Sequence, residues 1–250
     1  MNQTLLTLLA VGLTTVSFGQ KAFILSHQDK KGFFAVSAGG SQPVGRFASC
    51  SPIDDQAGMA GSGTVISLSA GYRLVGRVGL MVRGEQHRNA IRTHALLDGL
   101  YRNETDTWTA SADAWSMTTI MGGPYLIIPL GRFTLDTRLL AGRASAILPD
   151  THMSGNFGTV DMWVETTGSR SEATALGGGL SLRYRLGRSL SLHLNSDYNR
   201  ARFMFNNLTA TAQSNNGRSE RAGYSSSRTV SVVSVSAGIA LLFGNSHRPF

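Results

Sequence analysis

Two short stretches bring together serine, histidine and carboxylate side chains, which are the residue types of nucleophilic acyl-transfer sites. The segment LPDTHMSG contributes Asp150, His152 and Ser154, and the segment HLNSDY contributes His193, Ser196 and Asp197. A nucleophilic serine needs a base in hydrogen-bonding reach and a third group that orients the base. Strand alternation would place Ser196 on the face opposite to His193 and Asp197, and the first segment lies in a link without the rigidity of a site. We therefore expect no catalytic residues.

A second set of reactive side chains is charged or ionisable and lies inside apolar, alternating segments. These residues occupy the phase opposite to the aliphatic residues: Arg83, Glu85, Asp136, Arg138, Arg183, His193 and Asp197. Inside a closed cylinder they would form a polar network, with pairs such as Asp136 and Arg183 on adjacent strands. Paired buried charges fix the register at little net gain in stability. The alternative is a narrow ion path lined by the same groups.

No spacing in the chain indicates a metal or cofactor site. Asp54, Asp55 and the scattered histidines lack a ligand pattern, and the single cysteine, Cys50, excludes an intrachain disulfide and a cysteine-based zinc cluster. The net charge is +8, but the arginines are scattered singly, whereas nucleic-acid binding requires clustered charge. We expect no metal, no cofactor and no nucleic-acid partner.

The elements that must position these residues are predicted to be β-strands. From residue 33 onward, apolar and polar residues alternate with a period of two, which is the pattern of a strand. In TVISLSAGYRLV, for example, Ile66, Leu68 and Tyr72 share one face. Pro124, inside the segment at about 115–129, argues against a strand there, because proline is rare in the middle of a sheet. Eight strands are predicted, at about 32–47, 64–75, 77–86, 115–129, 133–142, 177–186, 189–198 and 232–243.

The links between these segments alternate between short and long. Three short ones contain an aliphatic residue followed by Gly-Arg, at Gly76, Gly131 and Gly187. We interpret these glycines as tight turns that need a positive φ. The long links are polar and lie at about 49–62, 89–113, 149–170 and 206–226. Short links at one end and long polar links at the other are typical of membrane β-barrels.

The aliphatic faces decide between a membrane barrel and a soluble one. Eight faces of leucine, isoleucine, valine and phenylalanine would overfill the interior of an eight-stranded barrel, so we expect them to face lipid. An aromatic girdle at the short-turn end supports this orientation: Phe34, Tyr72, Phe133, Tyr184 and Phe243. A sparser ring is expected near the long links, from Phe47, Trp115, Phe203 and Phe205. A soluble lipocalin-like barrel is the alternative.

Over residues 32–243 the chain resembles the small eight-stranded outer-membrane proteins of OmpA/OmpX type, in the outer-membrane β-barrel domain family. The segments FFAVSAGGSQPVGRF and VSVSAGIALLF carry the resemblance. It implies periplasmic turns, extracellular loops, outer-membrane lipids and lipopolysaccharide as surroundings, and insertion by the barrel assembly machinery. Members of the family often end in an aromatic residue; Phe243 and Phe250 both qualify here.

The chain is therefore expected to be an all-β, eight-stranded antiparallel up-and-down transmembrane barrel in the outer membrane. Residues 1–19 are expected to form a signal peptide, 20–31 a periplasmic leader segment, 32–243 the barrel and 244–250 a C-terminal tail. The expected function is non-enzymatic, with an envelope-structural or surface-binding role through the extracellular loops and an unidentified extracellular ligand. A narrow channel and a lipid A acyl-modifying enzyme are the alternatives.

Overall fold

The computed structural model of the protein describes residues 30–51, 54, 56–97, 107–131 and 133–245. The predicted signal peptide, residues 20–29 of the leader segment and residues 246–250 of the tail, with Phe250, lie outside the described residues. Expectations for those segments stay predictions.

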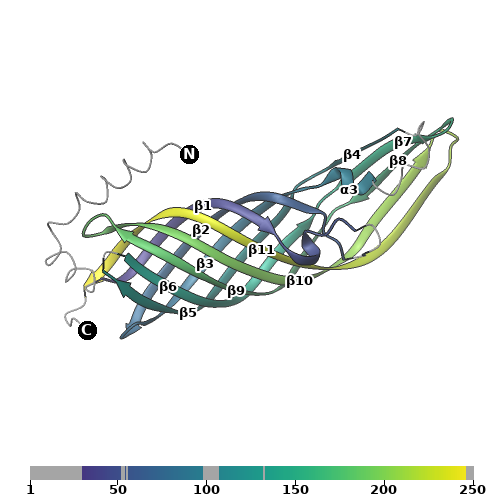
Figure 1. Cartoon of the computed structure of the whole chain (residues 1–250). Helices are drawn as coiled ribbons and strands as arrows, with labels where there is room; N and C mark the ends of the chain where they lie inside the picture. Colours follow the sequence, from purple (N-terminus) through teal and green to yellow (C-terminus); the bar gives the residue numbers. More distant parts are fainter. Residues whose placement is uncertain (1–29, 52–53, 55, 98–106, 132, 246–250) are drawn as a thin grey trace, which may run out of the picture.

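Eight long antiparallel strands close into a barrel (Figure 1). The ring order is β11-β1-β2-β3-β5-β6-β9-β10, and a further pairing of β10 with β11 closes it. This arrangement confirms the predicted fold class. The strands are β1 (Lys30–Pro43), β2 (Ala60–Val75), β3 (Val78–Ile91), β5 (Trp115–Leu130), β6 (Phe133–Leu148), β9 (Ser169–Arg185), β10 (Leu190–Ser214) and β11 (Ser219–Asn245).

The first and last strands extend past the expected barrel limits. β1 begins at Lys30, which pairs with Asn245 of β11, so each end reaches two residues beyond the predicted range of 32–243. At its other end β1 stops at Pro43, and residues 45–47 form the short 3-10 turn η1 (Gly45–Phe47) instead of continuing the strand.

Pro124 lies within β5, as the eight-strand count requires. The ladder between β5 and β6 is interrupted there, between the pairs Gly122–Ala141 and Tyr125–Arg138. Proline has no N–H to donate to a ladder, so the gap follows from the residue type. The register is the same on both sides of the gap, and β5 continues to Leu130.

Two of the three predicted turn glycines have the expected backbone. Gly76 has φ of 54° and Gly131 has φ of 66°, in links that directly join the paired residues Val75–Val78 and Leu130–Phe133. The prediction of a positive φ at Gly187 is wrong, because Gly187 is not among the positive-φ glycines of the described residues. The link from Arg185 to Leu190 is longer, so the chain reversal is spread over more residues.

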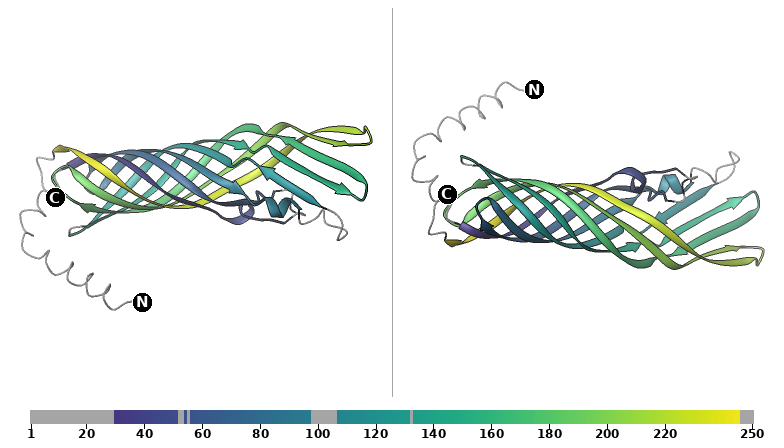
Figure 2. Two further views of the ribbon diagram at one scale, coloured as in Figure 1. Left: turned by 90° about the horizontal axis from the view of Figure 1, so that it is seen from above. Right: turned by 90° about the horizontal axis from the view of Figure 1, so that it is seen from below.

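Two of the four long links, at about 89–113 and 149–170, carry short elements of their own, which alternation in the sequence did not predict. They hold α3 (Thr93–Leu97), β4 (Trp108–Ala112), β7 (Thr151–Phe157) and β8 (Val160–Thr167). These strands pair in the order β10-β8-β7-β4. Together with residues 208–214 of β10 and 219–224 of β11, these strands form what we call the outer sheet. It projects beyond one end of the barrel (Figure 2).

The outer sheet begins at an irregularity in β10. β10 pairs with β9 as far as Ala201 and with β8 from Thr209 onward. Between these stretches, the register with β11 shifts between Phe205 and Leu208, and Asn207 has φ of 59°. A bulge of this kind bends and twists a strand, which lets one strand serve two partners.

The barrel is apolar outside and polar through most of its inside, as predicted. Leu192 and Leu241 are 43% and 60% exposed, whereas Arg138 is 4% exposed. Because a closed barrel leaves no sheet edge unpaired, the apolar exterior makes it a transmembrane barrel. Among the described residues, no helix combines the length and apolar character that a membrane crossing requires.

Candidate functional site

A charged bridge crosses the barrel lumen at mid-height. Arg83 of β3 contacts Asp197 of β10 at 3.0 Å from Nη2 to Oδ2, and these strands lie on opposite sides of the eight-stranded ring. Arg138 of β6 binds the other oxygen of the same carboxylate, at 2.5 Å from Nη2 and 2.8 Å from Nε. One carboxylate therefore ties three strands together through the interior.

Glu85 extends the bridge toward the long-link end. Its carboxylate accepts a hydrogen bond of 2.6 Å from Nε of Arg83 and lies 3.4 Å from Nε2 of His87. Asn199 of β10 donates to the same carboxylate from across the lumen. His87 in turn is hydrogen-bonded to Ser41 of β1 at 3.0 Å. All five side chains are buried.

A second charged pair lies nearer the short turns. Arg183 of β9 contacts Asp136 of β6 at 2.5 Å, as the sequence predicted for this pair. The guanidinium of Arg183 lies 5.0 Å from the ring centre of Phe33, a cation–π distance. The ring of His193 lies 5.8 Å from Phe33, and its Nε2 is 3.2 Å from the hydroxyl of Ser191.

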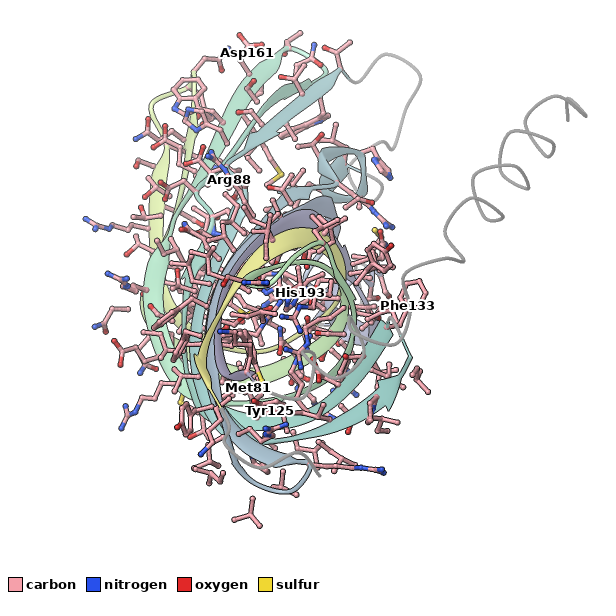
Figure 3. The ribbon with its side chains drawn as sticks, turned by 90° about the vertical axis from the view of Figure 1, so that its left-hand side faces the viewer. Met81, Arg88, Tyr125, Phe133, Asp161 and His193 are labelled. Atoms are coloured by element: carbon pink, nitrogen blue, oxygen red, sulfur yellow. The ribbon has the colours of Figure 1, made fainter. Side chains whose placement is uncertain are left out.

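Figure 3 looks into the barrel from its short-turn end. His193 lies within the ring of strands, Tyr125 lies on the inner wall, and Phe133 lies outside the ring. The view shows nitrogen and oxygen atoms gathered in the interior. The structure thus brings together in the lumen the seven residues named for the polar network, in two layers.

Small polar residues fill the space between the two layers. Ser37 and Ser67 are 2.6 Å apart. Asn195 accepts a hydrogen bond from Ser181 and donates to Ser37. Ser67, Ser181 and Asn195 share the strand phase opposite to the aliphatic residues, so alternation in the sequence indicates their inward position.

The lumen is closed near the long-link end by an apolar cluster. Phe47, Trp115, Phe203 and Phe205 are each at most 4% exposed. Trp115 lies 5.3 Å from Phe47 and 6.1 Å from Phe205 between ring centres. The expectation that these four form an outward aromatic ring is wrong. On β10, Phe203 and Phe205 share the inward, odd-numbered phase of His193 and Asp197, which directs them into the barrel.

The two serine-histidine-acid stretches do not assemble into an acyl-transfer site. His193 and Asp197 face inward and Ser196 faces outward. On β7, His152 lies 3.3 Å from Glu165, but the Ser154 hydroxyl is hydrogen-bonded to Thr109 at 3.0 Å. Asp150 accepts from the backbone of Gly168 instead of orienting the histidine. Among the described residues, no group of histidine, cysteine and carboxylates is arranged to hold a metal ion.

Aromatic side chains gather on the outside at the short-turn end. Phe34 and Phe243 are stacked with ring centres 5.0 Å apart, and Phe133 and Tyr184 are 5.2 Å apart. Phe34, Phe133 and Phe243 are exposed, as is Tyr72 on β2, while Tyr184 is half-buried. The five residues named for the girdle thus lie on the outer surface of the barrel toward its short-turn end, where aromatic residues are found at membrane interfaces.

Outward arginines replace the leucines toward the long-link end. Three outward arginines are exposed there: Arg88, Arg143 and Arg200. Arg143 is paired across the β5–β6 ladder with Ile120, an exposed isoleucine of β5. Arg143 is 3.8 Å from Glu172, with both side chains largely in solvent. The apolar belt therefore runs from the aromatic girdle to this arginine level, as in an outer-membrane protein.

Several solved structures of outer-membrane β-barrels are similar to this chain. One is a major outer membrane protein from Thermus thermophilus, at 13% identity and a TM-score of 0.45, covering 85% of this chain and 99% of that one. Another is Neisserial surface protein A, at 13% and 0.41, covering 85% and 97%. A third is the outer membrane protease OmpT from Escherichia coli, at 9% and 0.37, covering 85% and 97%.

No model of a known protein family and no curated protein sequence matches the chain. None of the three structural likenesses is close enough to transfer an activity. The function therefore has to be argued from the residues themselves.

Proposed function

We propose that this chain is a non-enzymatic integral outer-membrane protein that binds a partner at the cell surface through its outer sheet. The observation that carries the proposal is that β10 and β11 continue from the barrel wall, past the bulge in β10, into that sheet. β10 pairs with β8 from Thr209 to Ser214, β8 pairs with β7 along the whole length of β7, and β7 pairs with β4. The sheet thus stands on the barrel as a rigid platform.

The platform presents a polar face with a few large side chains. On β8, Asp161, Trp163 and Glu165 are exposed and alternate with half-buried Met162 and Val164. Binding residues in proteins concentrate on segments held out by a rigid scaffold. Tryptophan is enriched at binding hot spots. Trp163, whose Nε1 donates to Gln213 at 2.7 Å, is the anchor that we assign to this surface.

The hairpin that carries Trp163 can be removed without disturbing the barrel. Leu148 of β6 and Ser169 of β9 are already paired. Replacing residues 149–168 by an Asn-Gly turn would therefore join two strands in their existing register. Bacteria that display the full chain should attach to host-cell layers or immobilised matrix glycoproteins more than vector controls do. The turn variant and Trp163→Ala should lose that gain.

A fold control accompanies this test. Each variant should keep the heat-modifiable gel migration of a folded barrel after detergent extraction. Equal attachment by the full chain and the turn variant, or no gain over the vector on any surface, would overturn the surface-binding proposal.

A narrow channel is the second candidate, because charged side chains line the lumen. Against it, Arg83 and Asp197 meet across the full diameter, and the apolar cluster around Trp115 and Phe205 covers one end. We expect no discrete conductance steps from the refolded protein in planar bilayers. Stepwise currents would instead favour the channel. Lipid A from bacteria that express the protein should show unchanged acylation by mass spectrometry.

A further inference from the structure

A cavity of about 240 Å³ opens at the short-turn mouth of the barrel. It lies at the end opposite to the outer sheet and takes no part in the proposed surface binding. No carboxylate is among its described lining residues. Five of the lining residues are basic: Lys30, Lys31, Arg73, Arg77 and Arg183.

The basic residues converge on the cavity from separate strands and a turn. Lys30 and Lys31 open β1, Arg73 is near the end of β2, and Arg77 is in the turn between β2 and β3. Arg183 comes from β9 and is held by Asp136, which does not line the cavity. Like charges gathered in a partly enclosed mouth create a positive potential that a bound anion would relieve.

The floor and wall of the cavity add hydroxyl groups and apolar surface. Thr134 and Ser191 contribute hydroxyls, and Phe33 and Tyr125 meet edge to face at 5.9 Å between ring centres. Ile127 and Leu242 complete the apolar side. A ligand that fits would therefore have an anionic end and a small uncharged part.

We propose that this cavity binds a phosphate-bearing anion, of the size of a phosphate monoester or a diphosphate. Guanidinium groups bind phosphate oxygens in a bidentate way, and lysine adds a point charge. A phosphate monoester carries close to two negative charges at neutral pH, so it matches a cluster of several cations better than a single carboxylate does. The volume is below the range of drug-sized pockets, which limits the ligand to a small one.

Two sources can supply this chemistry on the periplasmic side. One is a soluble phosphate ester or diphosphate. The other is a phospholipid headgroup of the inner leaflet, since the aromatic girdle of Phe34 and Phe243 places the membrane interface at the same end of the barrel. Both present phosphate oxygens to the cavity, although the phosphodiester of a phospholipid carries a single negative charge, and an experiment can separate them.

Calorimetric titration of the refolded full chain with pyrophosphate and with glycerol 3-phosphate tests the site. The detergent should be octyl glucoside, which contains no phosphate. We expect saturable binding that weakens as the salt concentration rises. Arg77→Gln removes the positive charge of an exposed side chain that lines the cavity and should weaken binding at least fivefold.

Arg188→Gln is the matched control. Arg188 is also exposed, follows the glycine of another short turn and carries the same charge at the same end of the barrel, but it does not line the cavity. This variant should bind within twofold of the parent chain. Absence of binding to either phosphate probe at millimolar concentration would overturn the proposal. So would an equal loss in Arg77→Gln and Arg188→Gln, because it would show diffuse attraction without a site.

The source is distinguished in lipid nanodiscs. If a headgroup occupies the cavity, discs that contain phosphatidylglycerol should weaken pyrophosphate binding relative to discs of phosphatidylcholine, and Arg77→Gln should abolish that difference. If the ligand is soluble, the two kinds of disc should differ only by repulsion from the anionic surface, and that difference should persist in Arg77→Gln. Either result upholds a phosphate site, whereas loss of all binding in both kinds of disc contradicts it. Heat-modifiable migration confirms that each variant is folded.

Discussion

Asp197 is the residue on which the interior network depends, because it neutralises Arg83 and Arg138 together. Replacing it with alanine would leave Arg138 buried without its carboxylate partner and Arg83 with Glu85 alone. Breaking a buried ion pair by removing one partner costs about 3–5 kcal/mol. We therefore expect Asp197→Ala to lower the free energy of unfolding by about 3 kcal/mol, measured by urea titration of the protein in lipid vesicles.

Glu172 provides the matched control, since it is also a carboxylate beside an arginine. It lies 3.8 Å from Arg143 on the outer surface, with 64% of its side chain exposed. Exposed pairs contribute about 0–1 kcal/mol, so Glu172→Ala should leave the free energy of unfolding nearly unchanged. Similar losses in the two variants would contradict the role assigned to the lumen network.

At the residue scale, alternation identified the inward charges and one of their pairs, but not the pair that crosses the ring. The phase of β6 and β9 was enough to predict the Asp136–Arg183 pair on adjacent strands. The Arg83–Asp197 contact crosses the ring, so it depends on barrel closure and on the stagger of every ladder between β3 and β10. Phe203 and Phe205 show a different failure, because the expectation of an outer girdle was preferred to their own inward phase.

The short turns give the element-scale prediction, because two similar glycines differ in backbone conformation. Gly76 has a φ of 54°, with open space where a Cβ would lie, so a side chain there meets backbone strain alone. Gly187 also has open space but lies outside the positive-φ region. Gly76→Ala should lower the free energy of unfolding by about 1 kcal/mol. Gly187→Ala should change it by less than about 0.5 kcal/mol.

The same urea titrations measure both glycine variants. Equal stability of the two would mean that the turn at Gly76 relaxes to a negative φ at no cost, contrary to the structure. A larger loss in Gly187→Ala than in Gly76→Ala would reverse the assignment of the two turns.

The eight barrel strands were predictable because each keeps an aliphatic face over many residues. The strands of the outer sheet were missed because their links are rich in Thr, Ser, Asn and Gly. The signal was nevertheless present in β8, where Val160, Met162 and Val164 alternate with Asp161, Trp163 and Glu165. A period of two in a polar segment indicates a strand as well, only with a weaker apolar face.

In the barrel, polar side chains are buried and apolar side chains are exposed, which is the reverse of a soluble protein. Buried arginines and carboxylates lie on the axis, and leucines such as Leu139, which is 72% exposed, cover the wall. In water such a wall would be a large exposed apolar patch, which soluble monomers avoid. In lipid the same wall is the favourable surface, and closure of the ring satisfies the backbone.

A charge introduced on the wall distinguishes these two environments. Leu139 lies about midway along β6 between girdle residue Phe133 and Arg143. An arginine at the bilayer midplane of a barrel costs about 2–4 kcal/mol, falling to about 0–1 kcal/mol near the interfaces. Leu139→Arg should therefore lower the free energy of unfolding from vesicles by about 3 kcal/mol. Gln86→Arg, at the exposed arginine level of β3, should lower it by less than about 1 kcal/mol. A water-soluble barrel would gain from both substitutions or ignore them, so equal and small effects would reject the transmembrane assignment together with the proposals built on it.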